Sequence, residues 1–342
     1  MENQRGAWLV LNGVALVAFS IMCAVLAPLG PNPLALLLLP VTVGYLYGRG
    51  RHRLAVAMVV CGVATVAGVV ADLVSSTEFS WALKPAAGAV VVWYGLAGVA
   101  GLALGFGITR GWTYGRTFAA TLGILFSATL LFIARFWSGW MASAQQVQTA
   151  FDASLRRGAL GKGMKPGELD AARQRLESVL IAHWADISIG FMFAFTALVL
   201  ACIVVGVNRW LRGRPGVAGL RTGFLEIRMP DWLVWIVIAV AGLWFANQRW
   251  PHDMLRMITW NTAICLAVLY WLSGLAVILY VLRAVRAHAA VVVAVVLLVF
   301  LLQIHLMVSM FGLFDTWADF RRRIDEAIAA RKERENRGDD DW

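Results

Sequence analysis

Long apolar segments follow one another along most of this chain and are separated by short polar connections. Residues 6–48 contain no Asp, Glu, Lys or Arg, and Pro28, Pro31 and Pro33 lie in the middle of this run. A transmembrane helix needs about 20 apolar residues, so the run is long enough for two helices with a turn at the prolines. The same pattern predicts eight or nine spans, at 7–27, 34–48, 54–73, 86–108, 117–139, 183–207, 232–248, 256–282 and 289–313.

The predicted fold is therefore all-α, with one transmembrane bundle over residues 1–314 and two amphipathic elements. Residues 140–182 form a long connection, in which apolar residues at helical spacing flank a stretch with Gly and Pro, and this predicts a helical hairpin on the membrane surface. The last span is expected to break at Gly312, and residues 315–342 to form an amphipathic surface helix with a disordered acidic end. The apolar stripe of this helix consists of Trp317, Phe320, Ile324 and Ile328.

Small residues recur in the fourth predicted span at steps of four. They are Ala97, Gly101 and Gly105, and this spacing lets two helix backbones approach closely in lipid. A packing seam is the favoured interpretation, and a substrate path along the same face is the alternative.

The composition indicates that lipid is the solvent for most of the chain. Hydrophobic residues make up 60% of the 342 positions and charged residues 15%, whereas a soluble domain is about a quarter charged. The formal net charge of +10 comes mostly from arginine clusters between the apolar segments, where membrane orientation explains them better than nucleic-acid binding does. The four cysteines lie in four different apolar segments without metal-ligand spacing, so no disulfide framework and no metal site is predicted.

The arginine clusters also predict which side of the membrane each connection faces. They lie at 49–53, 110–116, 209–228 and 283–286. Under strict alternation of the spans all four fall on one side, which the positive-inside rule makes cytoplasmic, and the N-terminus is then cytoplasmic in a bacterial inner membrane. A ninth span, however, would place the arginine-rich tail outside. Either a short segment, 34–48 or 232–248, does not cross, or the tail is an exception.

Polar residues inside the predicted spans gather toward the outer side. Ionisable groups at such positions are costly unless they face protein or a water-filled cavity, so they mark a candidate site. The predicted ligand pocket consists of six residues: His305, Asp186, Arg135 and Asn261, with Ser309 and Gly312 shaping its wall. Pairing of Asp186 with Arg135 would lower the cost of burying both charges. Snorkelling of Arg135 to the membrane interface is the alternative.

His305 is the strongest single candidate in this set. It precedes Asp315 by ten residues, and roughly 15 Å of helix is about half the hydrocarbon thickness. His305 shares a helix face with Ser309 and Gly312, whereas Gln303 points elsewhere. A hydrogen bond between helices is the alternative role for this histidine.

Four stretches of the chain carry a family resemblance: MKPGELDAARQRLESVL at 164–180, MPDWLVWIVI at 229–238, NTAICLAVLYWLSGLAVILYVL at 261–282 and GLFDTWADFRRR at 312–323. They resemble a bacterial family of multi-pass membrane proteins typified by YybS, which has no assigned activity. The last stretch is the specific one, and the resemblance marks Gly312, Asp315, Phe320 and Arg321 as its structural signature. At the level of fold, the family is similar to the substrate-binding S components of ECF-type vitamin transporters.

These observations predict a multi-pass membrane protein that binds or transports a small molecule or lipid through an outward-opening pocket. The sequence has no HExxH, GxSxG or P-loop motif, so no catalytic residue and no cofactor is predicted. Besides the lipid bilayer, likeness to an S component implies an ATP-driven module of other chains as partner, and a homo-oligomer is the other expected assembly. The alternative function is a membrane scaffold or assembly factor that docks partners through the basic 209–228 loop and the C-terminal helix. A lipid-modifying enzyme is the third possibility.

Overall fold

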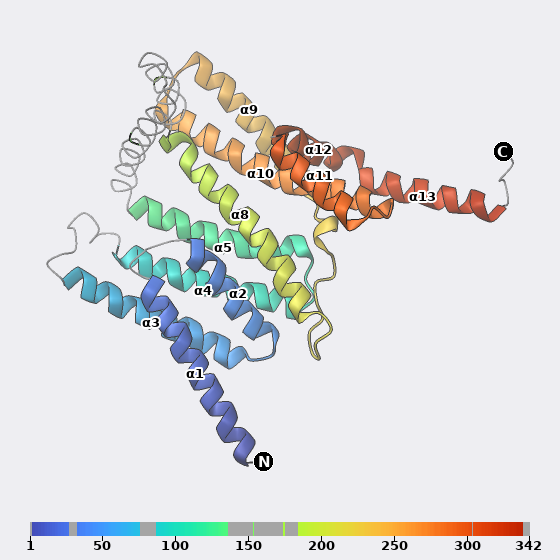
Figure 1. Ribbon diagram of the computed structural model, residues 1–342. Coiled ribbons are helices and arrows are strands. Elements are labelled where there is room, and N and C mark those ends of the chain that lie inside the picture. The colour runs from blue at the N-terminus through green and yellow to red at the C-terminus, as the bar shows by residue number, and fades with distance from the viewer. Residues whose placement is uncertain are drawn as a thin grey trace. The chain divides into compact units, whose positions relative to one another are not determined.

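Helices are the only regular secondary structure in the described part of the chain (Figure 1). The structure, a computed structural model, describes residues 2–26, 33–75, 87–135, 184–302 and 304–337, together with residues 153 and 174. The helices are α1 (Glu2–Leu26), α2 (Pro33–Gly48), α3 (His52–Ser75), α4 (Ala87–Thr109), α5 (Tyr114–Arg135), α8 (Trp184–Leu211), the 3-10 helix η4 (Phe224–Glu226), α9 (Leu233–Arg249), α10 (Asp253–Ala284), α11 (Ala289–Leu301), α12 (His305–Ala318) and α13 (Phe320–Arg337). The all-α prediction is confirmed for these residues.

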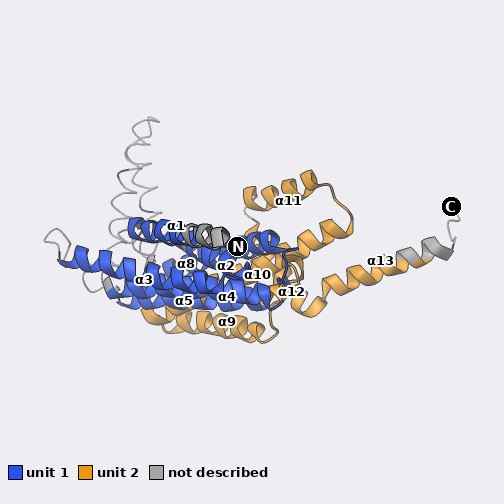
Figure 2. Cartoon of the chain, turned by 90° about the horizontal axis from the view of Figure 1, so that it is seen from below, with its two compact units in different colours: residues 1–112, 116–219 blue, residues 113–115, 220–342 orange. Residues whose placement is uncertain are grey.

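The chain divides into two compact units (Figure 2). The first unit comprises residues 1–112 and 116–219, with helices α1 to α4, most of α5, and α8. The second unit comprises residues 113–115 and 220–342, with η4 and α9 to α13. In the first unit the most extensive helix contact is between α2 and α4, and in the second unit it is between α10 and α12.

Most helices of the structure overlie the predicted spans, because a long apolar run determines both. Within the described residues, five helices are long and apolar enough to cross a membrane: His52–Ser75, Gly88–Thr109, Tyr114–Arg135, Ile187–Leu211 and Asp253–Ala284. Helices α11 and α12 together would count as a sixth, and three shorter apolar stretches are Asn12–Val25, Leu38–Gly48 and Leu233–Arg249. Five or six spans are thus supported by length, and the count of eight or nine stays a prediction. The predicted hairpin at 140–182 lies outside the described residues, apart from residues 153 and 174.

In the first unit, α4 packs against α2 along its small-residue face. A Cβ atom placed on Gly105 would lie 2.7 Å from the carbonyl oxygen of Gly44, and one on Gly101 would lie 3.0 Å from Cα of Pro40. Only a residue without a side chain lets two helix backbones approach so closely. The four-residue ladder is therefore a packing seam, as its spacing indicates.

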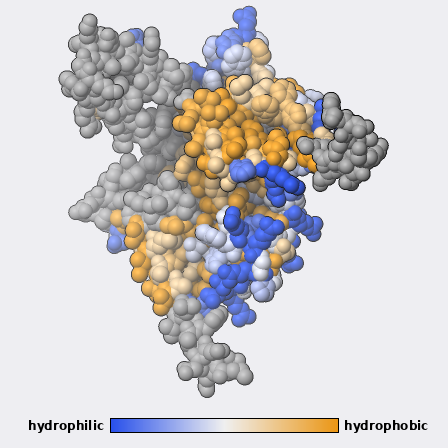
Figure 3. All heavy atoms as spheres, turned by 45° about the vertical axis from the view of Figure 1, so that its right-hand side comes forward, coloured by the Kyte–Doolittle hydropathy of each residue, from blue (hydrophilic) through white to orange (hydrophobic). Residues whose placement is uncertain are grey.

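Large apolar side chains cover much of the described surface, and Figure 3 shows them in broad patches beside hydrophilic ones. On α9, for example, Trp235 is 72% exposed and Phe245 is 67% exposed. Soluble monomers rarely expose large contiguous apolar patches, whereas helices that face lipid do so along their whole length. The surface thus agrees with the composition in indicating a membrane environment.

In the second unit, α10 is the central helix, and α9 and α12 pack against it. Leu233 of α9 joins Leu266 and Tyr270 of α10 in a buried cluster, and Leu313 of α12 packs beside them. Helices α9, α12 and α13 and the 3-10 helix η4 therefore pack on α10, whereas α11 packs on α12.

The last apolar segment is not the single helix that was predicted over residues 289–313. It consists of α11 and α12, which meet at an angle of 114°. Helix α12 then continues through Gly312, where a break was expected, and ends at Ala318. The reason is that Gly312 serves close packing against α10 rather than a change of chain direction.

The change of direction falls instead at Asp319, which has a left-handed φ of 44° and closes α12. Aspartate is one of the few residues with a side chain that tolerates this conformation. Helix α13 begins at the next residue, so Trp317 belongs to α12. The apolar stripe that was predicted from Trp317 to Ile328 is therefore divided between two helices.

Candidate functional site

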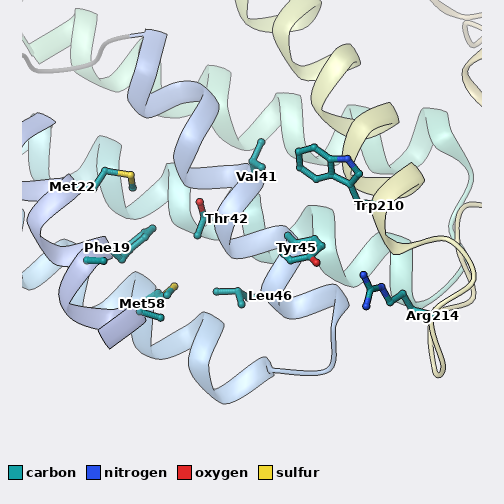
Figure 4. Close-up of a pocket in the computed structure, with 11 residues that line it drawn as sticks. Phe19, Met22, Val41, Thr42, Tyr45, Leu46, Met58, Trp210 and Arg214 are labelled. Carbon is teal, nitrogen blue, oxygen red and sulfur yellow. The ribbon is translucent and has the colours of Figure 1, made fainter. Parts of the chain in front are cut away.

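A mostly apolar groove of about 720 Å³ lies in the first unit between α1, α2, α3 and the C-terminal end of α8 (Figure 4). It is lined by Ala15, Ala18, Phe19 and Met22 of α1, Val41, Thr42, Tyr45 and Leu46 of α2, Met58 of α3, Trp210 of α8, and Arg214, which follows α8. Pockets that hold small ligands commonly have volumes of ~300–1,000 Å³. This site, which we call the α1–α2 groove, is therefore large enough for a ligand.

The polar side chains of the α1–α2 groove lie mainly at one end. Tyr45, Trp210 and Arg214 are neighbours there, whereas α1 and α3 contribute only apolar side chains (Figure 4). Thr42 is the other polar lining residue. The groove thus has the polarity of an amphiphile, with a long apolar part and a compact polar end.

Tight packing of α8 on α2 positions this polar end. Leu211 is fully buried, and a Cβ atom on Gly48 would overlap its Cδ1 atom. After Leu211 the chain turns through Gly213, whose φ of 81° favours glycine. The N–H of Arg214 donates to the carbonyl oxygen of Leu211 at 3.1 Å. The glycine contact and the glycine turn therefore determine where the Arg214 side chain begins.

Arg49 also reaches Tyr45 at this end. Its Nη1 atom donates to the Tyr45 hydroxyl oxygen at 3.1 Å, and its guanidinium carbon lies 5.6 Å from the centre of the ring. The Tyr45 ring meets the Trp210 ring edge to face, with 6.2 Å between their centres. None of the lining residues is acidic. Because arginines flank the aromatic pair, the end of the groove is cationic.

In the second unit, two glycines let α10 and α12 cross in direct backbone contact. A Cβ atom on Gly274 would overlap the carbonyl oxygen of Val308, and one on Gly312 would overlap the carbonyl oxygen of Tyr270. The Ser309 hydroxyl adds a hydrogen bond across the crossing. No space for a ligand remains where these backbones touch, so Gly312 and Ser309 serve helix packing here.

A buried ion pair holds the junction of α12 and α13. The Nη2 atom of Arg321 lies 3.5 Å from Oδ2 of Asp315, and the two side chains are 3% and 6% exposed. The other carboxylate oxygen, Oδ1, accepts the N–H of Phe320 at 3.1 Å. Asp315 therefore neutralises Arg321 and satisfies a free N–H group at the start of α13.

The Arg321 guanidinium is buried, so its positive charge needs a nearby negative charge to compensate for the water it has lost. Burial lowers the pKa of the Arg321 guanidinium because it removes water from the charged group, and the Asp315 carboxylate opposes this shift. Its three side-chain nitrogens are buried without a hydrogen-bond partner among the described residues. Asp315 therefore supplies the principal compensation for the buried charge.

Two contacts tie the start of α13 to earlier parts of the second unit. Nη2 of Arg228 lies 2.9 Å from Oδ1 of Asp319. The Tyr280 hydroxyl, near the end of α10, donates to Oδ1 of Asp325. The tail thus begins beside the final residue of the basic 209–228 loop.

The six residues of the predicted pocket are divided between the two units. Arg135 and Asp186 belong to the first unit, where Arg135 is exposed at the end of α5 and the Asp186 side chain lies outside the described residues. Their pairing stays a prediction. Gln303, which was expected to point away from the pocket, also lies outside the described residues.

The other four lie in the second unit, where His305, Ser309 and Gly312 are all on α12 and Asn261 is on α10. His305 is exposed at the start of α12, with its ring 5.7 Å from that of Phe300 and 6.0 Å from that of Trp271.

Two of these polar side chains are engaged with backbone carbonyls. The Ser309 hydroxyl lies 2.9 Å from the carbonyl oxygen of Ala267 on α10 and 3.0 Å from that of His305. The Asn261 amide donates to the carbonyl oxygen of Met257 within its own helix, at 2.9 Å. None of the six predicted residues lines the α1–α2 groove.

The residues of the groove were not identified from the sequence. Most are apolar, like any residue that faces lipid, and they come from four helices that are far apart in the chain. The signal that could have been used is WLRGR at 210–214, where a tryptophan and two arginines lie at the C-terminal end of a long apolar helix and in the turn after it.

The described residues contain no group of three His, Cys, Asp or Glu side chains that could hold a metal ion. Helices of span length, lipid-facing surfaces and a mostly apolar groove define the class of the protein as a multi-helix membrane protein. Residues 34–316 match a family described as "Predicted membrane protein (DUF2232)". The match covers most of the chain, and the protein therefore belongs to this family. No curated protein and no solved structure matches it.

Proposed function

We propose that the protein binds a lipid-like amphiphile in the α1–α2 groove. The observation that carries the proposal is the polarity of the groove, with apolar side chains over most of its length and Tyr45, Trp210 and Arg214 at one end. Each CH₂ group of an acyl chain contributes about 0.8 kcal/mol when it is buried. Tyrosine and tryptophan are the residues that favour the boundary between acyl chains and headgroups.

A lipid is one of the two ligand classes that were expected from the sequence, the other being a small molecule, but the proposed site differs from the predicted pocket. Arg49 and Arg214 belong to the arginine clusters at 49–53 and 209–228, which the positive-inside rule places in the cytoplasm. The polar end of the α1–α2 groove then faces the cytoplasmic leaflet of an inner membrane, and the N-terminus is cytoplasmic. We therefore propose an inward-facing lipid site in place of an outward-opening pocket.

The membrane topology that accompanies this proposal has eight crossings and a final segment that enters the membrane and returns. Arg228 belongs to a cluster assigned to the cytoplasm, and its contact with Asp319 supports the same side for the tail. The hydrogen bond between Tyr280 and Asp325 supports it too, because α10 ends at another such cluster, 283–286. The angle of 114° between α11 and α12 suits a segment that turns back. The tail then obeys the positive-inside rule, with α13 along the membrane surface.

Transport is an extension of the binding proposal. If the protein works like an S component of an ECF-type transporter, an ATP-driven module of other chains would move the bound molecule. The scaffold alternative is less favoured, because Arg228 and Asp319, which belong to its two docking surfaces, contact each other.

Filling the groove tests the proposal. Ala18 lines the groove from α1, whereas Ala64 is exposed on α3 and is not among the lining residues. We expect the purified protein to retain lipid in native mass spectrometry, Ala18→Trp to lose it, and Ala64→Trp to retain it. If Ala18→Trp retains as much lipid as the unmodified protein, the groove is not the binding site.

A further inference from the structure

We infer that the polar end of the α1–α2 groove selects acidic phospholipids over zwitterionic ones by binding their anionic headgroup at the phosphate. This inference rests on the proposed function, because it names the ligand class of the same groove. It concerns the headgroup only, so it can fail while lipid binding itself is established.

The first argument is the balance of charge at this end. Arg214 lines the groove, Arg49 donates a hydrogen bond to the lining residue Tyr45, and no lining residue is acidic. Within the described chain, neither arginine forms an ion pair, whereas Arg228, Arg256, Arg321 and Arg322 do. Two cations without an anionic partner therefore flank one end of an apolar groove.

The second argument is geometry. The hydrogen bond from Arg49 to the Tyr45 hydroxyl orients this oxygen so that its own proton is free for an acceptor. Arg214 lines the same end of the groove as Tyr45 (Figure 4), and its guanidinium presents a planar set of donors that suits phosphate oxygens. Both side chains can thus donate to one anion.

The third argument concerns the source of the phosphate. A soluble anion would use only the polar end and leave most of the groove empty, whereas a phospholipid fills the apolar part with its chain. Acidic phospholipids are abundant in the cytoplasmic leaflet, and this is the leaflet that the arginine clusters assign to the groove. A lipid is therefore the occupant that uses every part of the site.

The experiment compares spin-labelled phosphatidylglycerol with spin-labelled phosphatidylcholine of the same acyl chain, bound to the full-length protein in nanodiscs. The groove-dependent signal is the motionally restricted lipid that Ala18→Trp removes. We expect this signal to favour phosphatidylglycerol about fivefold, from the contribution of one arginine near an anionic headgroup. Arg214→Gln should abolish the preference, and Arg214→Lys should retain part of it. Arg212→Gln should leave it unchanged, because Arg212 is exposed in the same turn but does not line the groove.

The outcomes separate the two proposals. A groove-dependent signal that is equal for both lipids overturns the headgroup inference and leaves the proposed function standing. Loss of preference in Arg212→Gln to the same extent as in Arg214→Gln also overturns it, since general surface charge would then be responsible. Absence of a groove-dependent signal for either lipid overturns the proposed function, and the inference with it.

Discussion

The buried pair of Asp315 and Arg321 allows a quantitative prediction. At 3.5 Å, two unit charges attract by about 5 kcal/mol if the effective dielectric constant is near 20. Desolvation costs several kcal/mol for each ion, so the intact pair contributes little net stability. Removing one partner is different, because it leaves the other charge buried and uncompensated, at a cost of about 3–5 kcal/mol.

The variants follow from the contacts of each partner. Arg321→Met removes the cation and keeps the length of its side chain. Asp315→Asn removes the anion and retains an oxygen that can accept the Phe320 N–H. Each should lower the free energy of unfolding by about 3–5 kcal/mol, and the double variant should lose less than either, because no charge remains buried. Arg322→Met is the matched control, since Arg322 is 69% exposed and forms only surface ion pairs, so its effect should stay within about 0.5 kcal/mol.

Equilibrium unfolding in mixed detergent and SDS micelles, followed by circular dichroism, measures these differences. Additive losses in the double variant would refute the reasoning, because they would show that the two charges do not compensate each other. Single losses below about 1 kcal/mol would refute it too, since they would mean that neither charge is effectively desolvated.

Three further changes test other parts of the structure. Gly274→Ala should lower the free energy of unfolding by about 3 kcal/mol, because its methyl group would overlap a backbone carbonyl of α12. Gly242→Ala, with open space around it, should not destabilise the protein, and an equal loss in both variants would contradict the close crossing. Gly48→Ala should displace Leu211 and reduce lipid retention in native mass spectrometry, and the added Leu211→Ala change should restore it; no rescue would show that the Gly48–Leu211 contact does not position the polar end. In a cysteine-free background, Glu333→Cys should react with a membrane-impermeant maleimide only from the side on which Arg212→Cys reacts, and labelling from the opposite side would exclude the returning segment.

The sequence located the helices well and the interruption of the last one poorly. The length of an apolar segment determines whether a helix can span lipid, and this length can be counted directly in the sequence. The α11–α12 junction follows Leu301 and Leu302 without any proline or glycine, so no helix-breaking residue marks it. Gly312 carried such a signal, but its close contact with Tyr270 on another helix determines its role. A glycine that breaks a helix and a glycine that packs one look alike in sequence.

The candidate site was harder to predict for a related reason. Depth in a span was the argument for His305, and it depended on one continuous helix over 289–313. Once the helix is broken, His305 starts α12 and is exposed. The α1–α2 groove has the opposite character, because it is formed mainly by residues such as Ala18 and Met58 whose chemistry is unremarkable and whose proximity is tertiary. Rules that search for ionisable groups inside spans cannot find a mostly apolar groove of this kind.

The arginines that produce most of the net charge of +10 have different roles in the structure. Arg321 is buried and compensated mainly by the Asp315 carboxylate, and this pair joins α12 to α13. Arg228 and Asp319 form an ion pair that joins the basic loop to the tail. Arg214 has no acidic partner in the described chain and lines an apolar groove, which leaves its charge available for a ligand. The positive-inside rule accounts for arginine clusters between spans in general, whereas the contacts of each arginine distinguish structural charges from those that can bind an anion.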